Sequence, residues 1–136
     1  MQQVHEAIEA FLMAWQDDSD AAKQGFVRMK NLLAAQAGVH FEFHPRPGLT
    51  YSLRATHPHP SRSVVAMIDV IEDQPRWLSV CFFGDMIGDP EERGAFVPGG
   101  LLGEDALCFD LETCTEEELV YVEARIMEAC QAAAKG

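Results

Sequence analysis

The chain has few basic residues, and this scarcity excludes one large class of partner. Ten lysines and arginines stand against 22 aspartates and glutamates, which gives a formal net charge of −12 at pH 7. A nucleic-acid-binding protein gains affinity when Lys and Arg side chains replace the counterions of the phosphate backbone. We therefore expect no nucleic-acid partner.

Long apolar runs and closely spaced cysteines are missing as well. No stretch approaches the roughly 20 apolar residues that a bilayer span requires, and the first ten residues lack the basic region of an export signal. The four cysteines, Cys81, Cys108, Cys114 and Cys130, are scattered and form no CxxC pair. These absences predict a cytoplasmic protein with no membrane role, whose cysteines are free thiols.

Catalytic and cofactor signatures are also absent. No serine lies in a GxSxG sequence, and no HExxH pair offers histidines to a metal. The glycines at Gly99, Gly100 and Gly103 lack the lysine and hydroxyl residues of a phosphate-binding P-loop. We therefore predict no cofactor, no metal and no catalytic residue, and we favour a protein that is not an enzyme.

The overall composition is that of a folded domain. Hydrophobic residues make up 48% of the 136 residues and charged residues 24%, close to the averages for globular proteins. A chain of this length buries about two thirds of its unfolded surface. Because no repeat, low-complexity tract or linker interrupts it, we predict a single domain over residues 1–136.

Hydrophobic spacing predicts helices at both ends of the chain. Apolar residues recur every three or four positions over residues 4–15, and again before Gly38. A capping box from Thr115 to Glu118 opens a third helix, in which the apolar spacing continues to Cys130. We expect each helix to bury one face.

Between these helices the hydrophobic period changes to two, which is typical of half-buried strands. Residues 39–43 and 49–55 alternate in this way, and a register with Phe43 opposite Leu49 leaves residues 44–48 as a loop. Residues 63–71 and 76–83 are apolar on both alternations, which indicates central strands covered on both sides. Residues 106–111 form a predicted fifth strand.

Together these elements predict an α+β fold. We expect an antiparallel meander sheet of about five strands, in the order ααβββββα, with helices from both termini packed on one face. A long Gly-rich loop, residues 84–105, precedes the last strand. A connection beyond roughly 12–15 residues is usually functional or contains structure of its own.

The predicted register leaves an apolar strip on the face that the terminal helices do not cover. Its members are Val65, Met67, Leu78, Val80 and Phe82. A monomer hides such a strip beneath the loop at residues 84–105, and a homodimer hides it across a twofold axis. We expect the homodimer.

The same face carries a candidate binding site for a small ligand. Asp69 falls among apolar neighbours there, where an unpaired carboxylate is costly, and Arg54 or Thr50 on the adjoining strand can satisfy it. The candidate ligand-binding residues are His40, Glu42, Thr50, Ser52, Arg54 and Asp69. The alternation His40, Glu42, His44 also resembles a metal-binding pattern, but a solvated strand face is the interpretation that we favour.

The distribution of charge suggests which ligand this site prefers. Between residues 43 and 68 there is no acidic residue, but there are six basic or titratable ones: Arg46, Arg54, Arg62, His44, His57 and His59. Guanidinium groups bind carboxylate or phosphate oxygens in pairs, which favours an anionic ligand. The alternative, which we weigh more heavily, is that these arginines form ion pairs with acids such as Asp85, Asp89, Glu91 and Glu92.

Two functions from different classes follow. We favour a small, acidic, cytosolic binding or adaptor protein, homodimeric and non-enzymatic, which engages another protein. Small acidic chaperones of bacterial secretion systems are similar in size and charge. The alternative is a binding protein or enzyme for a small anion, with its site between the polar sheet face and residues 84–105. The alternative requires a pocket lined by at least three of the six candidate residues, whereas the adaptor leaves them spread over the surface.

Overall fold

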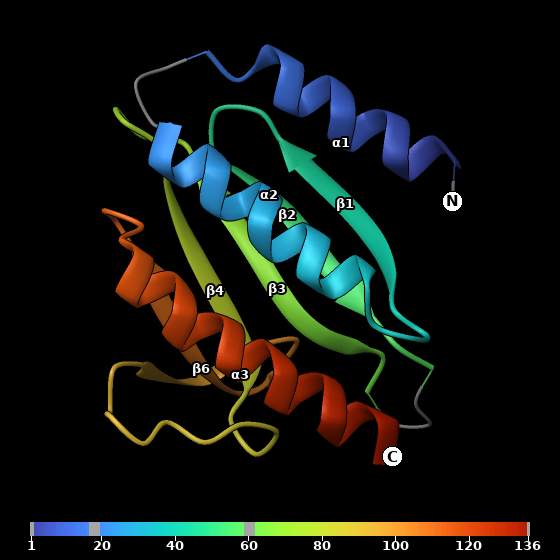
Figure 1. The fold of residues 1–136 in the computed structure, drawn as a ribbon, viewed down its shortest axis with the longest axis vertical. Coiled ribbons are helices and arrows are strands. Elements are labelled where there is room, and N and C mark those ends of the chain that lie inside the picture. Colours follow the sequence, from blue (N-terminus) through green and yellow to red (C-terminus); the bar gives the residue numbers. More distant parts are fainter. Residues whose placement is uncertain (1, 17–19, 59–61, 136) are drawn as a thin grey trace.

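The computed structural model describes residues 2–16, 20–58 and 62–135 (Figure 1). Two helices come first, α1 (Gln2–Ala14) and α2 (Asp20–Ala34), and α3 (Glu116–Lys135) ends the described chain. Between them lie β1 (His40–Arg46), β2 (Thr50–Thr56), β3 (Val64–Ile71), β4 (Trp77–Phe83), β5 (Ala95–Leu101) and β6 (Glu104–Leu111). The predicted α+β fold is confirmed, with helices at both ends of the chain.

The described strands form one antiparallel sheet in the order β1-β2-β3-β4-β6-β5. The sheet therefore has six strands instead of about five, because residues 95–101 pair with β6. Pro98 and two glycines made this segment unlike a strand in sequence. A proline is tolerated in β5 because the strand lies at the sheet margin, where one row of backbone donors has no partner strand.

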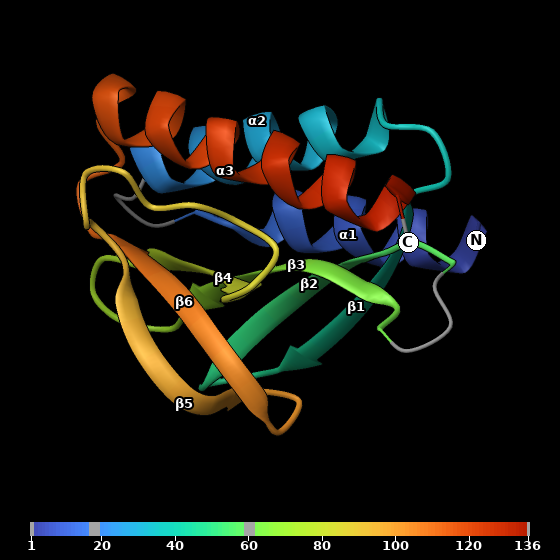
Figure 2. The ribbon, with the colours of Figure 1, turned by 90° about the horizontal axis from the view of Figure 1, so that it is seen from below.

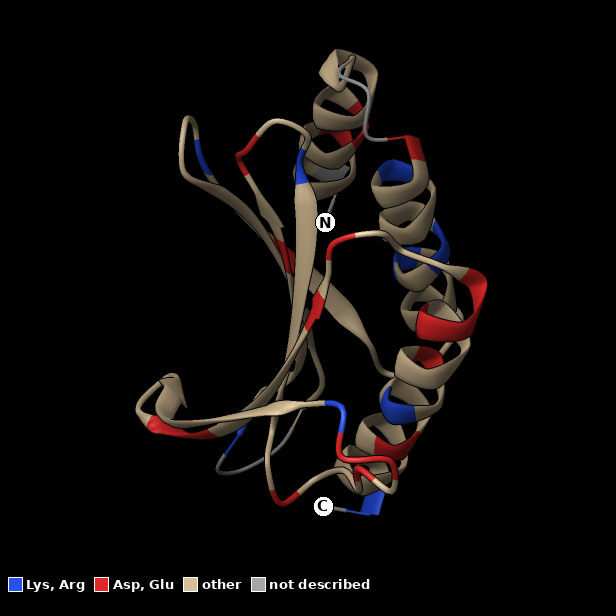
Figure 3. Ribbon diagram, turned by 90° about the vertical axis from the view of Figure 1, so that its left-hand side faces the viewer, with Lys and Arg blue, Asp and Glu red and all other residues tan. Residues whose placement is uncertain are grey.

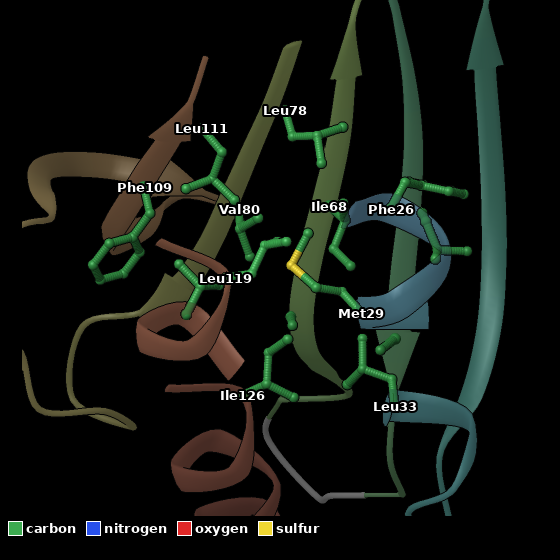
Figure 4. Packing of buried hydrophobic residues seen from close by; sticks show 14 of the residues in the cluster. Phe26, Met29, Leu33, Ile68, Leu78, Val80, Phe109, Leu111, Leu119 and Ile126 are labelled. Carbon is green, nitrogen blue, oxygen red and sulfur yellow. The ribbon is translucent and has the colours of Figure 1, made fainter. Parts of the chain in front are cut away.

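The helices α1, α2 and α3 lie against one face of the sheet (Figures 1 and 2). In the core between the layers, Phe26, Met29 and Leu33 of α2 point toward the apolar side chains of the central strands (Figure 4). Gly25 permits the close approach of α2 to α3, since a Cβ atom there would lie 3.2 Å from Leu119 Cδ2.

The third helix begins with the predicted capping box. The Glu118 amide donates to Thr115 Oγ1 over 3.2 Å, and the Thr115 amide donates to Glu118 Oε1 over 3.0 Å. Two amide donors at the helix start are thereby satisfied by side chains. This local signal was read correctly from the sequence.

The predicted register of the first hairpin was wrong. Phe43 pairs with Leu53, and Arg46 pairs with Thr50, so the strands continue almost to the turn. The longer ladder gains additional backbone pairs, and Gly48, with φ of 86°, allows the tight turn that closes it. Because the two registers differ by an even number of residues, the predicted faces of β1 and β2 are unchanged.

The predicted register between the third and fourth strands was also wrong, with larger consequences. Ile71 pairs with Trp77, so five residues separate the strands, where four had been expected. A shift of one residue moves every side chain of a strand to the other face. Leu78, Val80 and Phe82 therefore lie on the helix-covered face, each 0% exposed.

The predicted apolar strip consequently does not form. Val65 belongs to the same buried core as Leu78, Val80 and Phe82, whereas Met67 pairs with Arg54 and Cys81 on the opposite face. The helices of the same chain cover most of the surface that was expected to require a second subunit.

The region predicted as a long loop packs back onto the sheet at one end. A second, smaller cluster contains Val64, Phe83, Leu101 and Ala106, with Met67 packed against it. Leu101 is 1% exposed and Leu102 60% exposed, so only the first of these two leucines covers the sheet. The hairpin of β5 and β6 thus limits one end of the face opposite the helices.

The cysteines do not all remain free thiols. Cys81 of β4 and Cys108 of β6 are directly opposite each other and form a disulfide. The two cysteines are 27 residues apart in the sequence, and no local pattern predicts that they pair. Cys114 and Cys130 are buried free thiols. Burial raises the pKa of Cys114 to about 11, which makes its thiol a poor nucleophile.

Within the described residues, no helix has both the length and the apolar character needed to cross a bilayer.

Candidate functional site

The face of the sheet opposite the helices is the part of the molecule that carries the predicted site. Strand pairing aligns one polar row across five strands, formed by His44, Ser52, Asp69, Ser79 and Asp110. Directly opposed side chains in an antiparallel sheet have Cβ atoms about 4.5–5.5 Å apart. Asp69 therefore occupies the middle of a continuous polar row.

The sheet bends so that its margins project away from the helix layer, which makes this face concave (Figure 3). A pocket of about 480 Å³ lies over β1, β2 and β3. Its lining consists of Phe43, His44, Pro45, Arg46, Thr50, Ser52, Arg54, Met67 and Asp69.

Four of the six predicted ligand-binding residues meet in this pocket: Thr50, Ser52, Arg54 and Asp69. His40 and Glu42 lie on the same face of β1 but do not line it. Glu42 contacts His44 instead, with Oε1 2.9 Å from Nε2 at the pocket rim. The convergence of at least three candidates, which the small-ligand hypothesis required, is present.

Two lining residues, His44 and Arg46, were named as part of the acid-free segment but not among the six candidates, because the predicted register placed them in a loop. A signal for them existed in the sequence, since they continue the alternation that begins with His40 and Glu42. The long loop was expected to form one side of the site, but this pocket does not include it. None of residues 84–105, all of which the structure describes, lines the pocket.

Residues 88–94 of that segment are held against α3 instead. Asp89 accepts hydrogen bonds from the amides of Arg93 and Gly94 and from the Tyr121 hydroxyl. These bonds outweigh partial burial and lower the pKa of the Asp89 carboxyl. The Gly88 amide donates to Glu128 over 3.2 Å, so the loop is anchored at Tyr121 and at Glu128 of the last helix.

The arginines separate into two groups by their partners. Ion pairs with carboxylates involve five of the seven: Arg28, Arg62, Arg76, Arg93 and Arg125. For Arg62 the predicted ion-pair interpretation is confirmed, because it contacts Asp85 and Glu104. His59, from the same acid-free segment, lies outside the described residues.

Arg46 and Arg54 form the other group. Within the described part of the chain neither makes an ion pair, and both line the pocket. Arg46 Nη2 donates to Thr50 Oγ1 over 3.2 Å. Arg54 Nε is buried and has no hydrogen-bond partner among the described residues. The ion-pair interpretation therefore does not account for these two arginines.

Asp69 lies between these two arginines on the pocket floor. Burial raises the pKa of Asp69, while the nearby Ser52 hydroxyl and the guanidiniums of Arg54 and Arg46 lower it in part. Ser52 is 7% exposed. Asp69 Oδ1 and Ser52 Oγ are both buried, and neither makes a hydrogen bond of good geometry with a described residue. The floor thus offers polar atoms with unused bonding capacity.

The chemistry available here is recognition by charge and hydrogen bonds. Among the residues that the structure describes, no group of three or more His, Cys, Asp and Glu side chains could hold a metal ion. A cation pair on β1 and β2 faces a carboxyl and a hydroxyl on β2 and β3. Such a set can bind an anion and orient it.

Comparison with models of protein families, with curated proteins and with solved structures gave no match to this chain.

Proposed function

We propose that the protein binds a small anion in the pocket on the open face of its sheet, with Arg46 and Arg54 as the anion-binding residues. The observation that carries the proposal is that two arginines without carboxylate partners in the described chain lie together. Acidic residues outnumber basic ones by 22 to 10, yet the two arginines without an ion pair in the described residues line one pocket.

The chemistry of the pocket supports this choice of ligand. A guanidinium group presents several donors in a plane and binds carboxylate or phosphate oxygens in pairs. Arg54 Nε is buried without a partner among the described residues, so it lost its hydrogen bond to water on folding. An anion that accepts from Arg54 Nε replaces that lost hydrogen bond. The volume of about 480 Å³ falls within the range of roughly 300–1,000 Å³ typical of small-molecule sites.

The proposal is one of binding and includes no reaction. The buried thiols of Cys114 and Cys130 have raised pKa values, and neither residue lines the pocket. A bound anion of two charges can contact both arginines, and part of its affinity will come from their positive field in an otherwise acidic protein. Binding should therefore weaken as the salt concentration rises.

Isothermal titration of the purified chain with succinate, citrate and phosphate tests the proposal. Arg46→Gln and Arg54→Gln should each weaken binding at least about tenfold, the effect of losing one charge-assisted hydrogen bond. Lys30→Gln is the matched control, because it removes one positive charge from α2, on the other side of the sheet. The proposal fails if neither arginine variant changes the affinity, or if the lysine variant weakens binding equally.

A homodimeric adaptor is a second candidate, supported by a different surface. β5 is a margin strand, and on it Phe96 is 62% and Val97 36% exposed. An exposed aromatic residue on a strand with one free edge is suited to contact with a second copy of the chain. Light scattering should then give twice the chain mass of 15.1 kDa, and Phe96→Asp should return the monomer. A monomeric parent protein at high concentration would exclude this candidate.

A further inference from the structure

The position of Asp69 restricts which anions the pocket can accept. Ser52 is directly opposite Asp69 on the neighbouring strand, while Arg46 and Arg54 occupy the adjacent rows on either side. The guanidiniums of both arginines lower the pKa of this one carboxyl, so both are close enough to act on it. An anion held by the two arginines consequently lies near the carboxyl of Asp69.

A simple anion is poorly suited to that position. Its oxygen atoms accept hydrogen bonds, and so do those of an ionised carboxylate, so the two would repel each other. Asp69 Oδ1 would also remain buried without a partner, which is unfavourable. A donor on the ligand removes both problems, because it contributes the hydrogen that Asp69 lacks.

Arg54 and Asp69 do not already satisfy each other. They occupy neighbouring rows of adjacent strands, but no ion pair joins them, and Arg54 Nε and Asp69 Oδ1 both lack a partner in the described residues. A ligand that accepts from the guanidinium and donates to the carboxyl would give both atoms a hydrogen-bond partner. This arrangement is typical of a site that uses two opposite charges to orient one ligand.

We infer that the ligand is an anion carrying a hydroxyl or ammonium group next to its carboxylate or phosphate, and that Asp69 accepts a hydrogen bond from that group. This inference rests on the proposed function, since Arg46 and Arg54 must hold the anionic end. Asp69 is then the residue that determines specificity. A ligand without a donor leaves the buried acceptor unpaired, and the site therefore discriminates strongly against that ligand.

Two matched series of probes test the inference by isothermal titration. Succinate, malate and aspartate share one carbon skeleton and differ by hydrogen, hydroxyl or ammonium at a single carbon. Ethyl phosphate, 2-hydroxyethyl phosphate and phosphoethanolamine form the corresponding phosphate series. In the preferred series, a probe with a donor should bind the parent protein about tenfold to a hundredfold more tightly than the probe without one, as a hydrogen bond to a charged group requires.

Variants of Asp69 separate the two kinds of donor. Asp69→Ala should abolish the preference for either donor. Asp69→Asn keeps a carbonyl acceptor but no charge, so it should retain part of a preference for hydroxyl and lose a preference for ammonium. Asp110→Asn is the matched control, because Asp110 lies in the same polar row but outside the pocket. It should leave the preference unchanged.

The possible failures are distinguishable. If the three members of each series bind equally and Arg54→Gln weakens all of them, the inference about the donor is wrong and the anion-binding function stands. The same holds if the preference survives in Asp69→Ala. If no member of either series binds, the proposed function itself is wrong.

Discussion

Replacing Asp69 by asparagine should stabilise the protein, although it removes a residue that we assign to the binding site. The side chain is half-buried on a central strand, and burial raises the pKa of its carboxyl. Folding therefore disfavours the ionised form that predominates in the unfolded chain at neutral pH. Asparagine has nearly the same shape, carries no charge, and has an NH₂ group that can donate to Ser52 Oγ.

The magnitude follows from the atoms involved. Leaving one buried polar atom unpaired costs about 1–3 kcal/mol, and Asp69 Oδ1 is such an atom. The neighbouring guanidiniums of Arg46 and Arg54 offset part of this cost in the parent protein, and they lose a favourable neighbour in the variant. We therefore expect a net gain at the lower end, about 1 kcal/mol, which corresponds to a rise in Tm of about 4 °C for a chain of this size.

Thermal unfolding of both proteins between pH 7 and pH 4 measures the effect and its origin. Because the folded protein holds the pKa of Asp69 above the ordinary value of 3.8, the penalty applies above that raised pKa. It disappears as the pH falls through the raised pKa toward 3.8, since the folded protein then binds the proton. The difference in Tm should be greatest at pH 7 and should close on acidification.

A decrease in Tm at pH 7 would refute this reasoning, because it would make Asp69 a stabilising ion-pair partner of the arginines. A difference in Tm between the two proteins that does not depend on pH would also contradict this reasoning. Asp110→Asn is again the control, since this residue is exposed at the end of the same row and its replacement should change stability by less than about 0.5 kcal/mol. A higher Tm of Asp69→Asn than of the parent would mean that the carboxyl lowers stability, which is expected of a residue kept for binding.

Two further predictions concern the parts of the fold that frame the site. Phe82→Ala should destabilise the protein by about 3–5 kcal/mol in urea unfolding, because Phe82 is 0% exposed in the core beneath the helices; a cost below about 1 kcal/mol would mean that β4 has the opposite register. Asp89→Ala should increase amide hydrogen exchange in residues 85–94 and lower Tm, because three donors lose their acceptor. Since folding lowers the pKa of Asp89, its stabilising contribution is present above pH 3.8 and is lost as the pH falls through the lowered pKa. The contribution is therefore present at pH 7, and unchanged hydrogen exchange in Asp89→Ala at that pH would contradict the anchoring role.

Local signals in the sequence were sufficient for the helices and for the polar face of the first hairpin. The capping box at Thr115 depends on residues three positions apart, and it forms as expected. The register error at Phe43 did not disturb the site, because an even shift keeps His40, Glu42, Ser52 and Arg54 on one face. Four of the six candidate residues therefore line one pocket, and their role in binding stays a prediction.

The remaining features depend on contacts that no local pattern encodes. One additional residue in the turn before Trp77 exchanged the faces of β4, and with it the expected apolar strip disappeared. The strand at residues 95–101 exists because β6 supplies a partner for a segment with weak strand preference. Arg46 lines the pocket because β1 continues past Pro45. Each outcome was decided by tertiary pairing.

The proposed anion site is tested most directly by titrating malate into the parent protein and into the double variant Arg46→Gln/Arg54→Gln, at low and at moderate salt. The account predicts saturable binding to the parent that weakens as salt increases, and no detectable binding to the double variant, whose Tm should stay close to that of the parent. Binding of malate to the double variant with the parent's affinity would contradict the account.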